Sequence, residues 1–454
     1  MTSISQSRNL EFTQSIASKS ARLYARASEL MPGGCSRNTI LRKPHPLYAA
    51  KGEGCIVTDV EGVKRIDFAN NMASLIHGHA DPVVMRAVHQ QLEKGTAFTL
   101  ATEVEVLFAE HLVNRNPGFE KIRFVNSGTE AVMCCLKAAR AFTGRSKIAK
   151  VEGAYHGLYD YAETSQTSRP ENWGDADQPS SVSVAHGTPR AVLNEVVVIP
   201  FNDTKRALSI LDRHTEELAC VLLDYMPHRV GLTPATEEFV QALHGWTQLH
   251  GALLVADEVI TFRSCHGGAQ QWYGYCPDLT AMGKVIGGGF PVGALAGRRE
   301  VMDVMNPYTE PLLFPHSGTF SANPVTMAAG RTAMEIFDND AVVSLNRLAE
   351  QVRKQISEAI RLADVPACVS GAGSLFRVHM KPHPPSNYRQ AYVTSREAEL
   401  IMMMLEHLLE QGFIMINTCS GALSTAMTVQ EIDQLAEAML CGFRQMRKFM
   451  TDPA

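Results

Sequence analysis

Continuous runs of apolar residues recur between residues 120 and 300 and alternate with stretches of helical periodicity. Such runs are typical of strands that are buried on both faces of a mostly parallel sheet. They are IRFV (122–125), KIAKV (147–151), EVVVI (195–199), ACVLL (219–223), GALLVA (251–256) and VGALAG (292–297). The pattern predicts an α/β domain whose strands are joined by crossover helices.

The two ends of the chain show other patterns. Toward the N-terminus, the sequence predicts a helix over 12–30, two strands joined by a turn within 55–69, and a helix from Pro82 to about Leu92. Beyond residue 330, it predicts helices at about 340–363, 395–411 and 429–450, with strands within 368–380 and 412–417. We therefore expect an N-terminal segment (1–80), a large domain (81–330) and a C-terminal α+β domain (331–454).

Residues 163–194 are polar and rich in turn-forming residues. A loop of this length is uncommon inside a compact domain, and such loops often serve as active-site lids or binding loops. We interpret the segment in this way.

The composition excludes several classes of protein. Hydrophobic residues make up 45% of the 454 residues, too many for a disordered chain, and the net charge of −5 lacks the basic excess of a nucleic-acid-binding protein. No apolar run is long enough to predict a membrane span, and the N-terminus lacks the apolar stretch of a signal peptide. The ten cysteines form no CxxC pair and no zinc-site spacing, so we expect reduced thiols, no metal site and a cytoplasmic location.

Two residues at predicted strand ends could carry chemistry. Asp257 ends the GALLVA strand, where α/β folds bind ligands, although an Asp at this place could equally cap the next turn. Lys284 lies in an apolar stretch that leads into three glycines. Burial lowers the pKa of an amine, as Schiff-base chemistry requires, but a surface lysine beside a glycine turn is the alternative. Because Lys284 is followed by Val285, the stretch is not a phosphate-binding P-loop.

Three loops could bind the remainder of a ligand. Asn126–Ala131 follows the IRFV strand, where small residues at a helix start could bind a phosphate, but Ser127 and Glu130 could equally form a capping box. Tyr155, in the loop 152–157, could stack on a planar ring or simply pack within the loop. The small residues of 316–324 could donate further hydrogen bonds to an anion.

Taken in order, these motifs resemble those of the class III, fold-type I pyridoxal-phosphate (PLP) enzymes. Within that family the chain resembles the glutamate-1-semialdehyde aminomutase branch and its aminotransferase relatives, from about residue 20 to 450. The matching motifs are MPGG (31–34), GHADP (78–82), NSGTEA (126–131), GAYHG (153–157), DEV (257–259), DLTAMGKVIGGGFPVGALAGR (278–298) and HSGTFSANP (316–324). The resemblance implies a mostly parallel seven-stranded sheet and a smaller α+β domain built from both ends of the chain.

The resemblance also implies a role for each site residue. Lys284 would carry the cofactor as a Schiff base, and Asp257 would pair with its pyridine nitrogen. Tyr155 and His156 would lie against the cofactor, and Thr319 would contact the phosphate of the neighbouring subunit in a homodimer with shared active sites. The phosphate would be held within the subunit by Ser127, Gly128 and Thr129.

Departures from the aminomutase pattern cluster where a substrate would lie. The stretch Asp257–Arg263 lacks one glycine, the segment 223–227 replaces a strand end that is usually Glu-Pro, and 417–425 lacks an acidic residue. Arg37 lies near the place where β-amino-acid aminotransferases of this branch have an Arg that binds a carboxylate, although a solvated loop arginine is the alternative.

These departures favour an aminotransferase that moves an amino group from an amino acid or amine to a 2-oxo acid by a ping-pong mechanism. Three alternatives stay open: an intramolecular glutamate-1-semialdehyde aminomutase, another PLP reaction such as epimerisation or decarboxylation, and a binding protein that kept the fold. The last would be expected to lose Lys284 or Asp257, and both are present.

Overall fold

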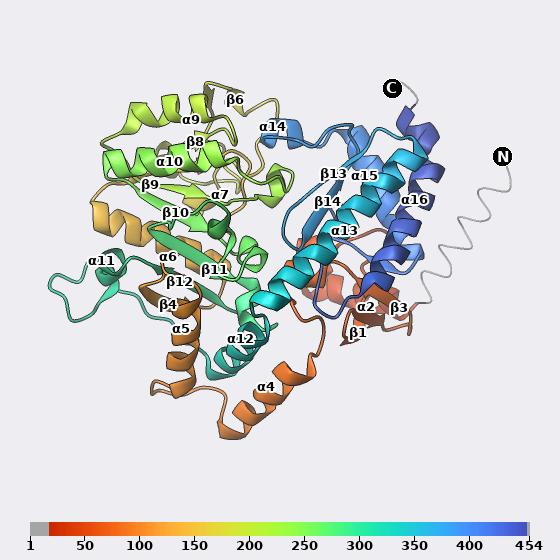
Figure 1. Cartoon of the computed structure of the whole chain (residues 1–454), viewed down its shortest axis with the longest axis horizontal. Coiled ribbons are helices and arrows are strands. Elements are labelled where there is room, and N and C mark those ends of the chain that lie inside the picture. Colours follow the sequence, from red (N-terminus) through yellow and green to blue (C-terminus); the bar gives the residue numbers. More distant parts are fainter. Residues whose placement is uncertain (1–17, 452–454) are drawn as a thin grey trace.

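A seven-stranded sheet forms the centre of the computed structural model, which describes residues 18–451 (Figure 1). The strand order is β4-β12-β11-β10-β9-β5-β8. The strands are β4 (Lys121–Val125), β5 (Lys147–Val151), β8 (Val196–Ile199), β9 (Leu218–Leu223), β10 (Leu253–Asp257), β11 (Leu279–Gly283) and β12 (Gly293–Gly297). Only β12 runs antiparallel to its neighbours, so the predicted mostly parallel α/β sheet is confirmed.

Alternate residues of one strand explain why its sequence is apolar throughout. On β9, Cys220 and Leu222 pack into the core beneath α6 (Gly128–Thr143), whereas Val221 and Leu223 pack into the core beneath α10 (Glu237–His250). All four side chains are fully buried. Both faces of the sheet are covered by helices, as the continuous apolar runs predict.

The remaining strands lie in smaller sheets. One joins β1 (Ala49–Glu53), β2 (Ile56–Asp59), β3 (Lys64–Asp67) and β15 (Phe413–Ile414), and another joins β13 (Cys368–Ser370), β14 (Leu375–His379) and β16 (Ser420–Ala422). The parallel pairing of Phe413 with Ile66 brings the two ends of the chain into one sheet. That pairing supports the predicted small domain, while the residue limits of the domains stay predictions. The strand predicted over 412–417 is confirmed only at Phe413–Ile414.

Helices cover the sheets and fill the space between them. In Figure 1 the cyan helix α13 and the dark-blue helix α16 lie on the same side of the molecule as the red N-terminal strands β1 and β3. Besides α6 and α10, the α-helices are α2 (Lys19–Leu30), α3 (Asn70–Ala73), α4 (Pro82–Lys94), α5 (Glu103–Arg115), α7 (Asp160–Glu163), α8 (Arg190–Asn194), α9 (Thr204–Leu211), α11 (Arg299–Met302), α12 (Pro324–Ile336), α13 (Asn339–Ala363), α14 (Tyr388–Ala391), α15 (Ser395–Glu410) and α16 (Val429–Thr451). Residues 12–17 of the first predicted helix lie outside the described residues. Within residues 18–451, no helix is both long and apolar enough to cross a membrane.

The segment 163–194 is packed against the rest of the protein. It contains the short strands β6 (Gly174–Asp175) and β7 (Gln178–Pro179), and the Tyr388 hydroxyl donates to the Ser168 carbonyl at 2.7 Å. Arg389 lies 5.0 Å from the centre of the Trp173 ring and pairs with Glu152. None of the residues 163–194 lines the pocket described below, so their interpretation as a lid finds no support in this chain.

Candidate active site

The carboxyl edge of the central sheet forms the floor of a pocket with a volume of about 420 Å³. Asp224 follows β9, Asp257 ends β10 and Lys284 follows β11, so three neighbouring strands each deliver one ionisable side chain to the same space. This edge is where open parallel sheets bind ligands, because the turns that leave the strands there form a crevice.

Asp257 is the most firmly held side chain of the floor. One carboxylate oxygen lies 2.7 Å from His156 Nδ1, and the other accepts a hydrogen bond from the Val259 backbone N–H at 3.0 Å. Burial lowers the pKa of His156, so its imidazole is neutral at neutral pH and donates to Asp257 without adding a positive charge. The negative charge of Asp257 therefore remains available for a cation in the pocket.

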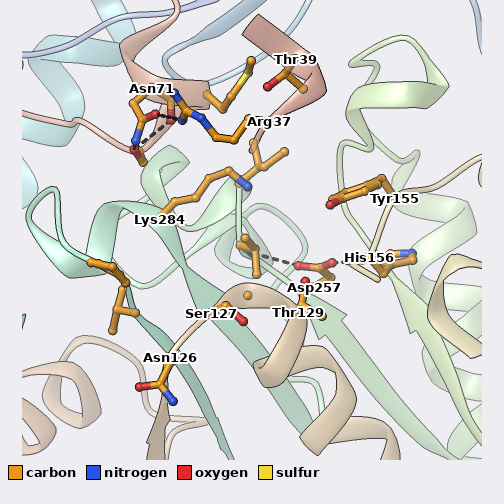
Figure 2. Close-up of a pocket in the computed structure, with 18 of the residues that line it drawn as sticks. Arg37, Thr39, Asn71, Asn126, Ser127, Thr129, Tyr155, His156, Asp257 and Lys284 are labelled. Carbon is orange, nitrogen blue, oxygen red and sulfur yellow. Dashed lines mark hydrogen bonds and ion pairs between the residues drawn. The ribbon is translucent and has the colours of Figure 1, made fainter. Parts of the chain in front are cut away.

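Lys284 begins the turn η7 (Lys284–Gly287) with a backbone φ of 49°. This left-handed conformation is uncommon for a residue other than glycine, and strained residues of this kind concentrate at functional sites. Burial lowers the pKa of the Lys284 amine, and the charges of Asp257 and Asp224 oppose that change. Figure 2 shows the side chain extending into the space bordered by Asp257, Tyr155 and the start of α6.

The N-terminus of α6 forms one wall of the pocket. Ser127 Oγ accepts from the Glu130 N–H at 3.1 Å, and the Glu130 carboxylate accepts from the Asn126 N–H at 2.5 Å. Ser127 therefore caps α6 as the capping box predicts, but the Glu130 carboxylate binds the N–H of Asn126 and not that of Ser127. Capping leaves the other N–H groups of the first turn available, and the helix dipole places positive potential there, which suits a phosphate. Gly128 lines this wall, and a Cβ on it would lie 2.8 Å from Val259 Cγ1.

Tyr155 forms the opposite wall, with 40% of its surface exposed. Its ring lies 5.5 Å from the Arg229 guanidinium. The neighbouring Gly157 has a φ of 93°, and a Cβ at this position would lie 2.5 Å from Thr129 Oγ1. The glycine therefore lets the loop that carries Tyr155 approach the start of α6 closely.

Arg37 stands at the mouth of the pocket. Its guanidinium donates to Asn71 Oδ1 at 2.6 Å, and no carboxylate within residues 18–451 pairs with it (Figure 2). Asn71 and Met72 have φ angles of 47° and 58°, so the backbone at this side of the pocket is left-handed. A guanidinium that is held by a neutral amide keeps its charge available for an anion.

Thr319 is exposed and does not line the pocket of its own chain. A Cβ on the neighbouring Gly318 would lie 3.6 Å from the Asn126 side chain, so the loop passes close to the start of α6. The contact between Thr319 and the neighbouring subunit's phosphate therefore stays a prediction.

Sequence comparison identifies the family of the chain that forms this pocket. The family described as aminotransferase class-III matches residues 40–441. The chain belongs to the class III aminotransferases. Enzymes of this family depend on PLP, which is the cofactor of this chain.

Relatives within the class III aminotransferases carry two kinds of name. The chain is 37% identical over 395 residues to a glutamate-1-semialdehyde 2,1-aminomutase of Methanothermobacter thermautotrophicus. The aligned region spans 87% of this chain and 91% of that relative. It is 45% identical to an omega-transaminase of Sphaerobacter thermophilus of known structure. The superposition has a TM-score of 0.93 and covers 95% of this chain and 98% of the omega-transaminase chain. A transaminase whose structure was solved with PLP bound is 41% identical to this chain. That superposition covers 96% of this chain and 99% of the transaminase chain, with a TM-score of 0.87.

The residues of the pocket match what PLP requires of a class III aminotransferase. The Lys284 amine suits an aldehyde, the Asp257 carboxylate suits a pyridinium nitrogen, and the N-terminus of α6 suits a phosphate. The glycines at 128 and 157 let the segments that border the pocket pack closely, because a Cβ at either position would lie within 3 Å of a neighbouring side chain. All the residues predicted for the site, except Thr319, line this one pocket.

Several residues that line this pocket have no role predicted from the sequence, among them Asp224 and Asn71. Asp224 was recognised only as part of a departure from the family pattern, and Asn71 lies in a segment without a recognisable motif. The position of Asp224 directly after the apolar ACVLL run is the signal that could have found it, because Asp257 follows its own strand in the same way.

Proposed function

We propose that the protein is a PLP-dependent aminotransferase that moves an amino group from an amino acid or amine to a 2-oxo acid by a ping-pong mechanism. The observation that carries this proposal is the meeting of the Lys284 amine, the Asp257 carboxylate and the N-terminus of α6 in one pocket. PLP, when bound, supplies an electron sink that stabilises negative charge on the substrate carbon.

Lys284 is proposed to hold the cofactor and to move the proton. Its amine is buried at the pocket floor, and burial lowers its pKa, so a larger fraction is uncharged and can act as a nucleophile or base. An amine whose pKa lies closer to neutral pH accepts and returns a proton more readily than an exposed lysine does.

Asp257 is proposed to hold the pyridine nitrogen through its negative charge. Its two hydrogen bonds, from His156 and from the Val259 N–H, fix the carboxylate before any ligand arrives. Such a fixed charge stabilises a developing positive charge without reorganisation during the reaction. Ser127, Gly128 and Thr129 are proposed to hold the phosphate, with Tyr155 and His156 at the ring.

Arg37 is proposed to bind the carboxylate of the substrate. Its guanidinium lines the same pocket as Lys284, and within residues 18–451 its only hydrogen-bond partner is the neutral Asn71 side chain. A planar guanidinium accommodates a carboxylate in a two-pronged contact, which suits both an amino acid and a 2-oxo acid.

Transamination is favoured over intramolecular amino transfer by two observations. The solved omega-transaminase is 45% identical to this chain over nearly its whole length. The segment 417–425 also lacks the acidic residue of the aminomutase pattern. The second candidate, glutamate-1-semialdehyde aminomutase, is favoured by the name of the 37% identical relative.

The active enzyme is proposed to be a cytoplasmic homodimer with shared active sites. Thr319 lies in a region where large apolar side chains are exposed, among them Tyr308, Leu313 and Phe320. An exposed apolar patch of this kind is what a subunit interface covers. Sedimentation should give a dimer, and a fully active monomer would contradict this part of the proposal.

A half-reaction screen tests the proposed function. The PLP form is mixed with a panel of α-, β- and D-amino acids and simple amines, and conversion to the pyridoxamine form is followed in the visible spectrum. At least one donor should convert the enzyme, and a 2-oxo acid should restore it. Failure of every donor, together with turnover of glutamate-1-semialdehyde in the absence of an acceptor, would establish the aminomutase instead.

A further inference from the structure

Asp224 and Asp257 leave adjacent strands at the same level. Leu223 on β9 pairs with Ala256 on β10 in parallel register, so the two aspartates that follow stand side by side at the edge of the sheet. Both line the pocket, and each is only 4% exposed. Two carboxyl groups are therefore confined next to each other in the pocket that holds the Lys284 amine, and the charges of both act on that amine.

The two carboxyl groups are held very differently. Asp257 accepts one hydrogen bond on each oxygen, from His156 and from the Val259 N–H. Asp224 accepts a single one, from the Met226 N–H at 2.9 Å, and no cation within residues 18–451 forms an ion pair with it. The structure thus stabilises negative charge on Asp257 much more than on Asp224.

Neighbouring buried carboxyl groups do not both ionise readily, because desolvation and mutual repulsion disfavour the second charge. Burial, followed by the charges of Asp257 and Glu258, raises the pKa of Asp224 well above its ordinary value, and Lys284 opposes this only in part. The titratable groups that interact with Asp224 are Asp257, Glu258, Tyr273 and Lys284.

We propose that Asp224 is a positioning residue that keeps the proton of this carboxyl pair, so that Lys284 faces one negative charge instead of two. A second carboxylate would stabilise the ammonium form of Lys284 and reduce the fraction that can attack a carbonyl. Asp224 thereby keeps Lys284 reactive while Asp257 keeps its charge. The proposal rests on the role given to Lys284 under the proposed function.

Competitive labelling of the full-length protein, freed of PLP, tests this directly. Acetic anhydride at a fixed pH near neutral reacts with an amine only in its uncharged form, and peptide mapping compares the labelling of Lys284 with that of exposed lysines in the same sample. The variants are Asp224→Asn, Asp257→Asn and the double variant. Asparagine keeps an oxygen that can accept from the Met226 N–H, so the local hydrogen bond can be retained.

If the two carboxyl groups share one proton, the effects of the two substitutions on the Lys284 labelling rate should not be additive. Asp224→Asn should change the Lys284 labelling rate less than twofold, because the side chain is already neutral. Asp257→Asn should also change it little, because Asp224 then ionises in its place. The double variant removes the remaining charge and should label Lys284 about tenfold faster.

Two outcomes would overturn the proposal. If Asp224→Asn alone raises the Lys284 labelling rate tenfold, Asp224 is ionised in the native protein. If Asp257→Asn and the double variant raise the labelling rate equally, the two carboxyl groups share no proton. If a variant does not fold, infrared spectra of native protein with ¹³C-labelled aspartate replace it, and absence of a protonated Asp carboxyl band at neutral pH would contradict the proposal. Labelling needs no turnover, so a failed half-reaction screen would reject the aminotransferase without deciding the state of Asp224.

Discussion

The floor and the mouth of the pocket are built in opposite ways. At the floor, Asp257 and Asp224 stand on adjacent buried strands and Lys284 on the next turn, so their positions follow from the register of the central sheet. At the mouth, Arg37 lies on an exposed segment and is held by one hydrogen bond to Asn71. The proposed cofactor site thus depends on the register of the sheet, whereas the proposed substrate contact of Arg37 depends on an exposed segment outside the sheet.

The largest effect is expected at the floor, from Lys284→Ala. In its proposed role the amine both attaches PLP and moves the proton, so its loss should lower turnover by about 10,000-fold. Steady-state kinetics with a donor from the screen measures the change. The exposed Lys205→Ala serves as the control and should retain native activity. Turnover within tenfold of native in Lys284→Ala would place the base elsewhere.

Asp257→Asn should produce the next largest loss. The amide keeps the shape of the side chain but removes the charge, so turnover should fall by about 100- to 1,000-fold. Asp257→Glu, which keeps the charge, should recover part of the loss. Equal activities for the Asn and Glu variants would show that the charge of Asp257 is not what matters.

The stability of the fold toward acid should depend on two buried histidines, His228 and His379, and not on Arg37 at the mouth of the pocket. Burial and the charge of Arg377 lower the pKa of His228 and His379 from 6.5 to about 3. Between these values the unfolded chain binds protons that the folded protein does not, so the free energy of unfolding falls as the pH falls. Each histidine should contribute about 1.4 kcal/mol per pH unit at most.

Denaturant unfolding between pH 7 and pH 4 checks this dependence. His379→Gln should lose about half of the slope attributed to the pair, whereas Arg37→Ala should leave it unchanged. An unchanged slope in His379→Gln would contradict the assignment.

The smallest effect is expected at the mouth, from Arg37→Ala. The Michaelis constant for donors with a carboxylate should rise about tenfold, because one charge-assisted contact is lost, while kcat changes little. Amine donors without a carboxylate provide the internal control and should be unaffected. An equal loss for both kinds of donor would mean that Arg37 supports the fold rather than binding the carboxylate.

Strands buried on both faces could be predicted from the sequence because their residues are apolar throughout. Strand β11 could not be recognised because its residues, LTAMG, include no Val or Ile and lead directly into the glycine-rich turn. The pairing of Phe413 with Ile66 joins residues that are far apart in the chain, and local periodicity carries no information about such contacts.

Within the site, Lys284 and Asp257 could be found because each interrupts or ends an apolar stretch. The state of Asp224 could not be predicted, because it depends on the alignment of two strands and on which carboxyl group receives more hydrogen bonds. The left-handed backbone at Asn71 and Met72 likewise depends on tertiary packing, since neither residue requires it.

Borohydride reduction of the PLP-bound enzyme followed by peptide mapping is the decisive test of whether Lys284 carries PLP. Reduction makes the bond between lysine and cofactor permanent, so the labelled residue is the one that carries PLP. Lys150 is a demanding competitor, because it is also buried and burial lowers its pKa to about 7. The label is expected on Lys284, and a label on Lys150 or any other lysine would contradict the proposed role of Lys284.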